Sequence, residues 1–321
     1  MNIQSISIVV PTKGCVNSCK FCVSSMHESP YEDHFDEISY RKRIKYAAMN
    51  GVNTLILTGT GEALQNTSFL SKLALVLEKE HHPFPNVELQ TSGVMLTNQE
   101  ESVILENDDG RLAKYYPNIS LLKRLGVNTV SLSVSDIFDS DNNWDINGTP
   151  EVLRKSLIEL TQFIKKQGFN LRLSLNMTNV YNKIKPFQLY KKCYDLGANQ
   201  ITLRKLYYPD EDPRIESPQT KWVKNNSCDE DKFFEIEGYI TGNEFLDPDD
   251  PIDGTIVNRG GYGKPLYRLP FGAMVYSYEG MSIAIDDNCM SKNNTEDLKY
   301  VILRENGKLY CQWDDEGSLI F

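Results

Sequence analysis

Strand-like and helical segments alternate along the first two thirds of this chain of 321 residues. Strands that alternate with helices pair in parallel and are joined by right-handed crossovers, so the alternation predicts an α/β fold. Six such units are too few for a closed eight-stranded barrel. They fit either an open, partial barrel or a doubly wound sheet. The six predicted strands are Ile6–Val10, Thr54–Leu57, Val87–Gln90, Thr129–Ser133, Leu171–Leu175 and Gln200–Leu203.

Two of the intervening helices have recognisable ends in the sequence. Asp36 is expected to cap a helix from Glu37 to Asn50, and Gly51 is expected to stop it. A second helix is predicted to begin at Thr149-Pro150, because Pro is favoured at the first helical position, and to end at Gly168. Its apolar residues recur at helical spacing: Val152, Leu153, Leu157, Leu160, Phe163 and Ile164.

The amino-acid composition changes after Tyr208. Residues 209–254 are rich in Pro and Asp, which is typical of a linker or a lid, and one short helix is expected around Asp229–Tyr239. The following residues have the pattern of antiparallel strands, with hairpin turns expected at Glu279-Gly280 and Asn306-Gly307. We therefore predict three parts, with boundaries at 1–208, 209–254 and 255–321, the last being a mainly antiparallel β extension.

Three cysteines lie within one short loop directly after the first predicted strand: Cys15, Cys19 and Cys22. Three thiolates suit a thiophilic metal centre, and the missing fourth ligand leaves one metal position open for chemistry. An alternative is a structural zinc site, in which His27 supplies the fourth ligand. Such a site would be closed and would need no barrel behind it.

The C-x3-C-x2-C spacing, with the aromatic Phe21 before the last cysteine, resembles the signature of the radical S-adenosylmethionine (SAM) enzymes. The resemblance implies that the three cysteines hold one [4Fe-4S] cluster and that SAM binds its fourth iron. It also favours a partial (β/α)6, TIM-like barrel over a doubly wound sheet. An electron donor such as flavodoxin or ferredoxin would reduce the cluster. SAM cleavage would then yield a 5′-deoxyadenosyl radical that abstracts hydrogen from a substrate.

A second motif, Thr58-Gly59-Thr60-Gly61-Glu62, follows the second predicted strand. Glycines let a backbone approach a ligand closely, and a carboxylate beside them accepts hydrogen bonds from an ammonium. The motif resembles the Gly-Gly-Glu element of the same family, with Thr60 in place of one glycine. The resemblance therefore assigns Gly59, Thr60, Gly61 and Glu62 to the SAM amino group.

Further polar side chains stand at the ends of the later strands, where ligands of such barrels collect. The resemblance assigns the Phe21 backbone to the SAM adenine, and Ser133 and Asn176 to its carboxylate or ribose. Thr91 belongs to a strand end similar to the family's Thr-Asn-Gly and is predicted to bind SAM. Arg204 is predicted to pair with a carboxylate of SAM or of the substrate.

Composition and charge narrow the class of partner. A formal net charge of −10 disfavours nucleic acid, because phosphate binding usually needs a basic face. Seven cysteines, three of them crowded near the N-terminus, argue against a secreted disulfide framework. Neither a secretory leader pattern nor an apolar stretch of about 20 residues occurs. The chain is therefore predicted to be cytoplasmic, without a membrane partner.

The remaining cysteines are too widely spread to predict a second cluster, but Cys289 is a candidate hydrogen donor to a substrate radical. The predicted function is that of a radical SAM enzyme with a small-molecule substrate, such as a nucleotide, sugar or amino-acid derivative. A peptide substrate, with epimerisation or cross-linking, is the alternative, and RNA modification ranks third. A zinc-stabilised binding protein is the non-enzymatic alternative.

Overall fold

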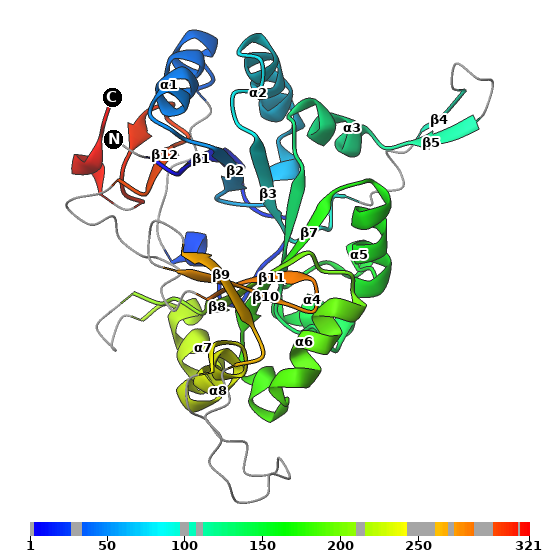
Figure 1. Ribbon diagram of the computed structural model, residues 1–321. Coiled ribbons are helices and arrows are strands. Elements are labelled where there is room, and N and C mark those ends of the chain that lie inside the picture. Colours follow the sequence, from blue (N-terminus) through cyan, green and yellow to red (C-terminus); the bar gives the residue numbers. More distant parts are fainter. Residues whose placement is uncertain are drawn as a thin grey trace, which may run out of the picture.

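The computed structural model describes residues 3–26, 34–96, 103–106, 112–209, 216–242, 261–268, 273–285, 298–313 and 315–321. Within these ranges one 11-stranded sheet curves through the molecule, in the order β13-β12-β1-β2-β3-β6-β7-β8-β11-β10-β9 (Figure 1). A separate hairpin of two strands, β4 and β5, projects from one side of it.

Six parallel strands form the centre of the sheet and match the predicted strands to within two residues. Each one pairs in parallel with the next, so their order in space follows their order along the chain. A doubly wound sheet would reverse direction at a switch point, and this one does not. The predicted partial (β/α)6 barrel is therefore confirmed. Its strands are β1 (Ser5–Val10), β2 (Thr54–Gly59), β3 (Asn86–Thr91), β6 (Thr129–Val134), β7 (Asn170–Met177) and β8 (Gln200–Lys205).

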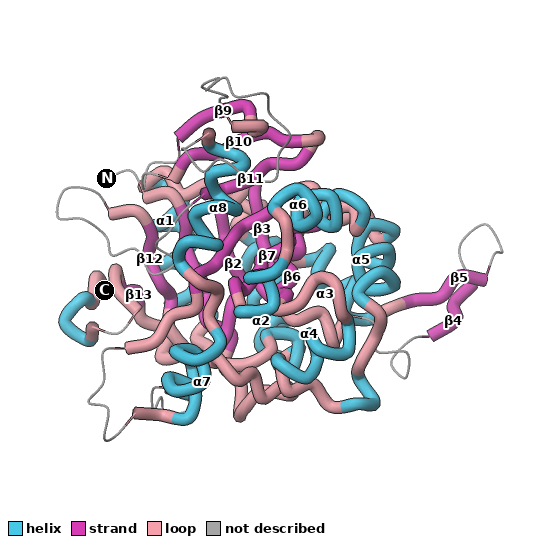
Figure 2. Tube along the Cα trace, turned by 90° about the horizontal axis from the view of Figure 1, so that it is seen from below, coloured by secondary structure: helices cyan, strands magenta, loops and turns pink. Residues whose placement is uncertain are grey.

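Helices lie around the outside of this curved sheet, and the apolar core fills the space between them (Figures 1 and 2). Asp36 caps the first helix as predicted, accepting hydrogen bonds from the backbone N–H groups of Ile38 and Ser39. The helices that connect the central strands are α1 (Glu37–Met49), α2 (Thr67–Lys79), α3 (Pro117–Arg124), α4 (Ser140–Ile146), α5 (Leu157–Lys166) and α6 (Pro186–Asp195). Short 3-10 helices are η1 (Val23–Ser25), η2 (Ala63–Gln65), η3 (Glu151–Leu153), η4 (Asn179–Lys183) and η5 (Glu316–Ser318).

The predicted start of one helix at Thr149-Pro150 is wrong. Only the short turn η3 follows Pro150, and the side chain of Val152 is 88% exposed instead of facing the core. The helix α5 begins at Leu157, where the Ser156 hydroxyl caps it by accepting from the N–H of Glu159. The Thr149 side chain instead bonds to Asn17 in the cysteine loop.

The two predicted C-terminal hairpins are present, but they lie on opposite edges of the sheet. β11 pairs in parallel with β8, whereas β12 pairs in parallel with β1. The β-rich segment therefore extends both edges of the barrel sheet instead of forming a sheet of its own. Its strands are β9 (Lys264–Arg268), β10 (Met274–Tyr278), β11 (Met281–Ile285), β12 (Tyr300–Leu303) and β13 (Leu309–Tyr310).

Two features escaped the sequence analysis. The segment between barrel and β extension contains the expected helix, α8 (Glu230–Thr241), but also α7 (Pro218–Asn226). The hairpin of β4 (Val103–Glu106) and β5 (Leu112–Tyr115) interrupts the connection between β3 and α3. Among the described helices, none combines the length and the apolar character needed to cross a membrane.

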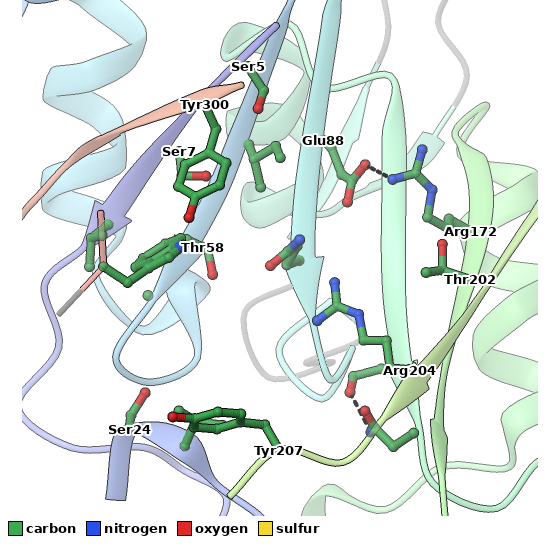
Figure 3. A pocket seen from close by; sticks show the side chains of 18 of the residues that line it. Ser5, Ser7, Ser24, Thr58, Glu88, Arg172, Thr202, Arg204, Tyr207 and Tyr300 are labelled. Carbon is green, nitrogen blue, oxygen red and sulfur yellow. Dashed lines mark hydrogen bonds and ion pairs between the residues drawn. The ribbon is translucent and has the colours of Figure 1, made fainter. Parts of the chain in front are cut away.

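The interior of the barrel is polar at the end away from the cysteine loop. Glu88 on β3 is buried and forms an ion pair with Arg172 on β7, as Figure 3 shows. The Nε of Arg172 also donates to Oε1 of Gln200 on β8, at 2.7 Å. Three strands are thus connected across the barrel by one buried carboxylate and its partners.

Replacing Arg172 with methionine is expected to destabilise the fold by about 3 kcal/mol, because the buried Glu88 carboxylate then loses its charge partner. Urea titration measures this change as a difference in the free energy of unfolding. Arg124→Met is the matched control, since Arg124 pairs with Glu78 and both side chains are largely solvated, 48% and 37% exposed. An equal loss of unfolding free energy in the two variants would show that burial of the Glu88–Arg172 pair does not set its contribution to stability.

Candidate functional site

The cysteine loop leaves the end of β1 and carries three thiols that form no disulfide. Cys15 is exposed, whereas Cys19 and Cys22 are half-buried. The N–H of Cys22 donates to the carbonyl of Cys19 at 3.1 Å, which closes a turn between the last two cysteines. Both of these cysteines line the large cavity of the barrel.

The backbone of the cysteine loop is docked on the segment that follows α4. The N–H of Ser18 donates to the carbonyl of Gly148 at 3.2 Å, and the N–H of Lys20 donates to the carbonyl of Ile146 at 3.1 Å. Gly148 has φ +58°, and a Cβ atom there would lie 2.4 Å from the Ser18 carbonyl oxygen. Only glycine therefore permits this close approach.

Two side chains complete the docking of the loop. The Thr149 hydroxyl donates to Oδ1 of Asn17 at 3.0 Å, and both residues are buried. On the other side of the loop, the N–H of Val16 donates to Oε1 of Gln65 at 2.8 Å. Backbone groups between the cysteines are thereby held from two directions, so the spacing of the thiols is set before any ligand binds.

Glu62 stands at the end of β2 and is buried. Its Oε1 accepts a hydrogen bond from the Thr91 hydroxyl at 2.6 Å. Its Oε2 accepts from both the N–H and the hydroxyl of Ser92, at 3.0 and 2.7 Å. The structure thus brings two predicted residues, Glu62 and Thr91, into direct contact and adds Ser92, whose role the sequence analysis missed.

Ser133 and Asn176 are also brought together. The Asn176 side-chain amide donates to the Ser133 hydroxyl at 3.0 Å and to the Ser135 hydroxyl at 3.3 Å. Arg204 lies on the neighbouring strand, directly opposite Asn176 in the register. Three of the predicted residues therefore stand side by side at the ends of β6, β7 and β8.

One cavity of about 960 Å³ connects most of the predicted residues. From the cysteine loop it is lined by Cys19, Phe21 and Cys22. From the strand ends it is lined by Gly59, Thr60, Ser133, Asn176 and Arg204. Cys15, Gly61, Glu62 and Thr91 are not part of this lining, but Gly61 follows the lining residue Thr60 and packs against Gly14 and Cys15. Cys289 and His27 lie outside the described residues.

Comparison with known proteins identifies the family. The model of the radical SAM superfamily matches residues 9–184, which is more than half of the chain. The chain belongs to the radical SAM superfamily. This match confirms the expected family of enzymes on the same stretch that carries the cysteine loop and the Gly-Thr-Gly-Glu element. No curated protein matches the chain in sequence.

Solved radical SAM structures share the fold at low sequence identity. SuiB from Streptococcus suis bound to S-adenosylmethionine is 13% identical, with a TM-score of 0.51 over 97% of this chain and 60% of that one. The enzyme anSMEcpe, with bound AdoMet and a Kp18Cys peptide, is 14% identical, with a TM-score of 0.50 over 73% of this chain and 57% of that one. The present chain thus spans about 60% of the length of SuiB.

The family implies a [4Fe-4S] cluster, and the three thiols can be tested against it. All three thiols are free of disulfide bonds, and Cys19 and Cys22 line the cavity. Thiolate sulfur is the usual protein ligand of iron–sulfur clusters. The chemistry of the three side chains therefore fits a cluster.

The protonation of the thiols also bears on metal binding. Burial raises the pKa of Cys19 to about 12, and the neighbouring Cys22 and Cys15 add to the effect. The Cys15 thiol is partly desolvated, although the residue as a whole is exposed, and this desolvation raises its pKa as well. Cys15 and Cys19 are therefore protonated at neutral pH in the metal-free protein, and cluster binding must displace these two protons.

Replacing Gly148 with alanine is expected to displace the cysteine loop, because the new Cβ would collide with the Ser18 carbonyl. After anaerobic reconstitution, iron and sulfide per chain should fall well below the wild-type content. Gly168→Ala is the matched control: its φ of +87° imposes a similar backbone strain of about 1 kcal/mol, but nothing lies within 4 Å of its Cβ position. Full iron content in Gly148→Ala would show that the docking does not control the loop.

Proposed function

We propose that this protein is a radical SAM enzyme that cleaves SAM reductively and uses the resulting carbon radical to abstract hydrogen from a small-molecule substrate. The observation that carries the proposal is the contact between the cysteine loop and the Gly-Thr-Gly-Glu element at one cavity. A Cβ atom on Gly61 would lie 2.8 Å from the Gly14 carbonyl oxygen and 3.3 Å from the Cα of Cys15. A group bound by the cysteines would thus lie beside Glu62.

Each part of this site has a proposed task. Cys15, Cys19 and Cys22 hold the cluster. When bound, the cluster and SAM supply one electron and the hydrogen-abstracting radical. The chain's own residues bind and orient SAM and the substrate, and they exclude water from the radical. The backbone of Phe21 is proposed to face the SAM adenine. The Phe21 ring packs against that of Trp222, with 6.1 Å between the ring centroids.

Glu62 is suited to an ammonium group. A carboxylate oxygen accepts about two hydrogen bonds. Oε2 already accepts two from Ser92, whereas Oε1 accepts only one, from Thr91. One acceptor position on a fixed, buried carboxylate therefore remains, and a charge-assisted bond to the SAM amino group would use it. Ser133 and Asn176 are proposed to face the SAM carboxylate or ribose.

The substrate is proposed to be a small, polar anion. The cavity of about 960 Å³ lies at the large end of the range for ligand pockets, so it can accommodate SAM and a second small molecule. The Arg204 side chain points into it between Tyr207 and the Glu88–Arg172 pair, as Figure 3 shows. Throughout the described part of the chain, the Arg204 guanidinium has no hydrogen-bond or ion-pair partner. A carboxylate or phosphate of the substrate would pair with it.

The C-terminal part of the chain is proposed to close the open side of the barrel and to select the substrate. Supporting this, side chains from the described part of residues 255–321 line the cavity, among them Tyr267, Val275 and Tyr300. An electron donor such as flavodoxin or ferredoxin and a cytoplasmic location belong to the same proposal. A peptide substrate is the second candidate, supported by the fold-level likeness to the peptide-bound enzyme anSMEcpe.

Anaerobic purification tests the proposed function. The wild type is expected to be brown, with broad absorption near about 400 nm, and to form 5′-deoxyadenosine from SAM and reductant. Cys19→Ala should lose both properties, because it removes one of three thiolates. Cys228→Ala is the control for cysteine removal and should keep both. A colourless protein that binds one zinc tightly would contradict the proposal and favour the zinc alternative.

The proposed anionic substrate can be tested with pairs of acids and their neutral amides. Turnover is read as substrate-dependent 5′-deoxyadenosine, with deuterium transfer from labelled substrate. Acids are expected to react and amides to fail, and Arg204→Gln should raise the KM of a reacting acid by roughly 10- to 100-fold through loss of a charge-assisted hydrogen bond. Arg124→Gln is the control, since Arg124 pairs with Glu78 and does not line the cavity. Equal turnover of an acid and its amide would contradict the assignment.

A further inference from the structure

The C-terminal hairpin brings a carboxylate to the Gly-Thr-Gly-Glu element. The hydroxyl of Thr60 donates to Oε1 of Glu305 at 2.8 Å, although the two residues are 245 positions apart. Glu305 is buried, and both residues line the large cavity. No sequence pattern predicted this contact, and the proposed function does not use it.

Strand register explains why Glu305 arrives at this level of the barrel. Ile8 of β1 pairs with Leu303 of β12, so the residue two positions after Leu303 is level with Val10. Val10 in turn pairs with Gly59 at the end of β2. Glu305, after β12, and Thr60, after β2, therefore lie at about the same level of the barrel on either side of β1. The turn after Glu305 is held in place by Asn306, whose Oδ1 accepts from the N–H of Lys308 at 3.0 Å.

Thr60 is the one position of the Gly-Thr-Gly triplet that has room for a side chain. A Cβ atom on Gly59 would lie 2.8 Å from the Val10 carbonyl oxygen, and one on Gly61 would lie 2.8 Å from the Gly14 carbonyl oxygen. The triplet is thus packed against β1 on one side and against the cysteine loop on the other. Its middle residue faces the cavity, where the Thr60 hydroxyl meets Glu305 and lies 3.5 Å from the Thr12 hydroxyl.

The contact restrains the backbone of the triplet. Threonine is stiff at χ1, so fixing its hydroxyl also fixes the orientation of the peptide groups on either side. A buried carboxylate is costly unless it is hydrogen-bonded, and a bond to an ionised acceptor is stronger than a neutral one. The Thr60–Glu305 bond therefore opposes movement of the strand end that has been assigned to the SAM amino group.

We infer that Glu305 is a positioning residue of the SAM site, acting through Thr60, so that the C-terminal hairpin completes the site of the cofactor. This inference rests on the proposed function, because it takes residues 59–62 to bind SAM. It goes further by giving the hairpin of β12 and β13 a task in cofactor binding, separate from any choice of substrate. Loss of the bond would leave the cysteine loop intact and weaken SAM binding.

The test measures the Kd of SAM by equilibrium dialysis with anaerobically reconstituted protein of equal iron content. Glu305→Ala and Thr60→Val each remove one partner of the bond and are expected to raise the Kd about tenfold. The double variant should be no weaker than either single one, because both remove the same interaction. Glu305→Gln and Thr60→Ser keep an acceptor and a donor and should restore most of the affinity.

Glu78→Gln is the control for the loss of a carboxylate. Glu78 pairs with Arg124, its side chain is 37% exposed and does not line the cavity, and its loss should leave the Kd of SAM unchanged. Unchanged affinity in Glu305→Ala and Thr60→Val, or additive losses in the double variant, would overturn the inference. A third result would also overturn it: Glu305→Gln binds SAM as weakly as Glu305→Ala, whereas Thr60→Val binds SAM with the wild-type Kd. That result would place Glu305 in direct contact with SAM. A wild type that binds no SAM would instead refute the proposed function.

Discussion

The position of β1 between β2 and β12 is the constraint on which the rest of the site depends. β1 carries the cysteine loop at its end, and its parallel register with β2 sets the Gly-Thr-Gly-Glu element directly beside that loop. Its register with β12, on the other side, sets the C-terminal hairpin at the same level. A slip of one residue in either pairing would turn alternate side chains to the opposite face and separate these groups.

Much of the barrel could be read from local sequence. The central strands are short apolar runs bounded by polar residues, and such runs keep their identity in a buried parallel sheet. Asp36 caps α1 because a side-chain acceptor before a helix satisfies its first N–H groups without help from elsewhere in the chain. The cysteine spacing and the glycines of β2 were informative for the same reason, since their chemistry depends on neighbours within a few residues.

The missed features depend on distant partners. Thr149-Pro150 has the local pattern of a helix start, but the Thr149 hydroxyl bonds to Asn17, and only the short 3-10 helix η3 precedes the start of α5 at Leu157. The bonds from Val16 to Gln65 and from Thr60 to Glu305 each join residues far apart in the chain, so no local spacing encodes them. The two C-terminal hairpins were recognised from their turns, whereas their separation onto opposite edges follows only from parallel pairing with β8 and β1.

The same pairing has a consequence for the order of folding. Ser5 is paired with Tyr300, so one edge of the strand that carries the cysteines finds its neighbour only after almost the whole chain has been synthesised. Closing so long a loop is slow compared with forming the successive strand–helix units between them. The barrel can therefore assemble from β1 to β8 first, with the edge of β1 still unpaired. A nascent chain would then carry the cysteine loop at the end of β1 while one edge of that strand is still unpaired.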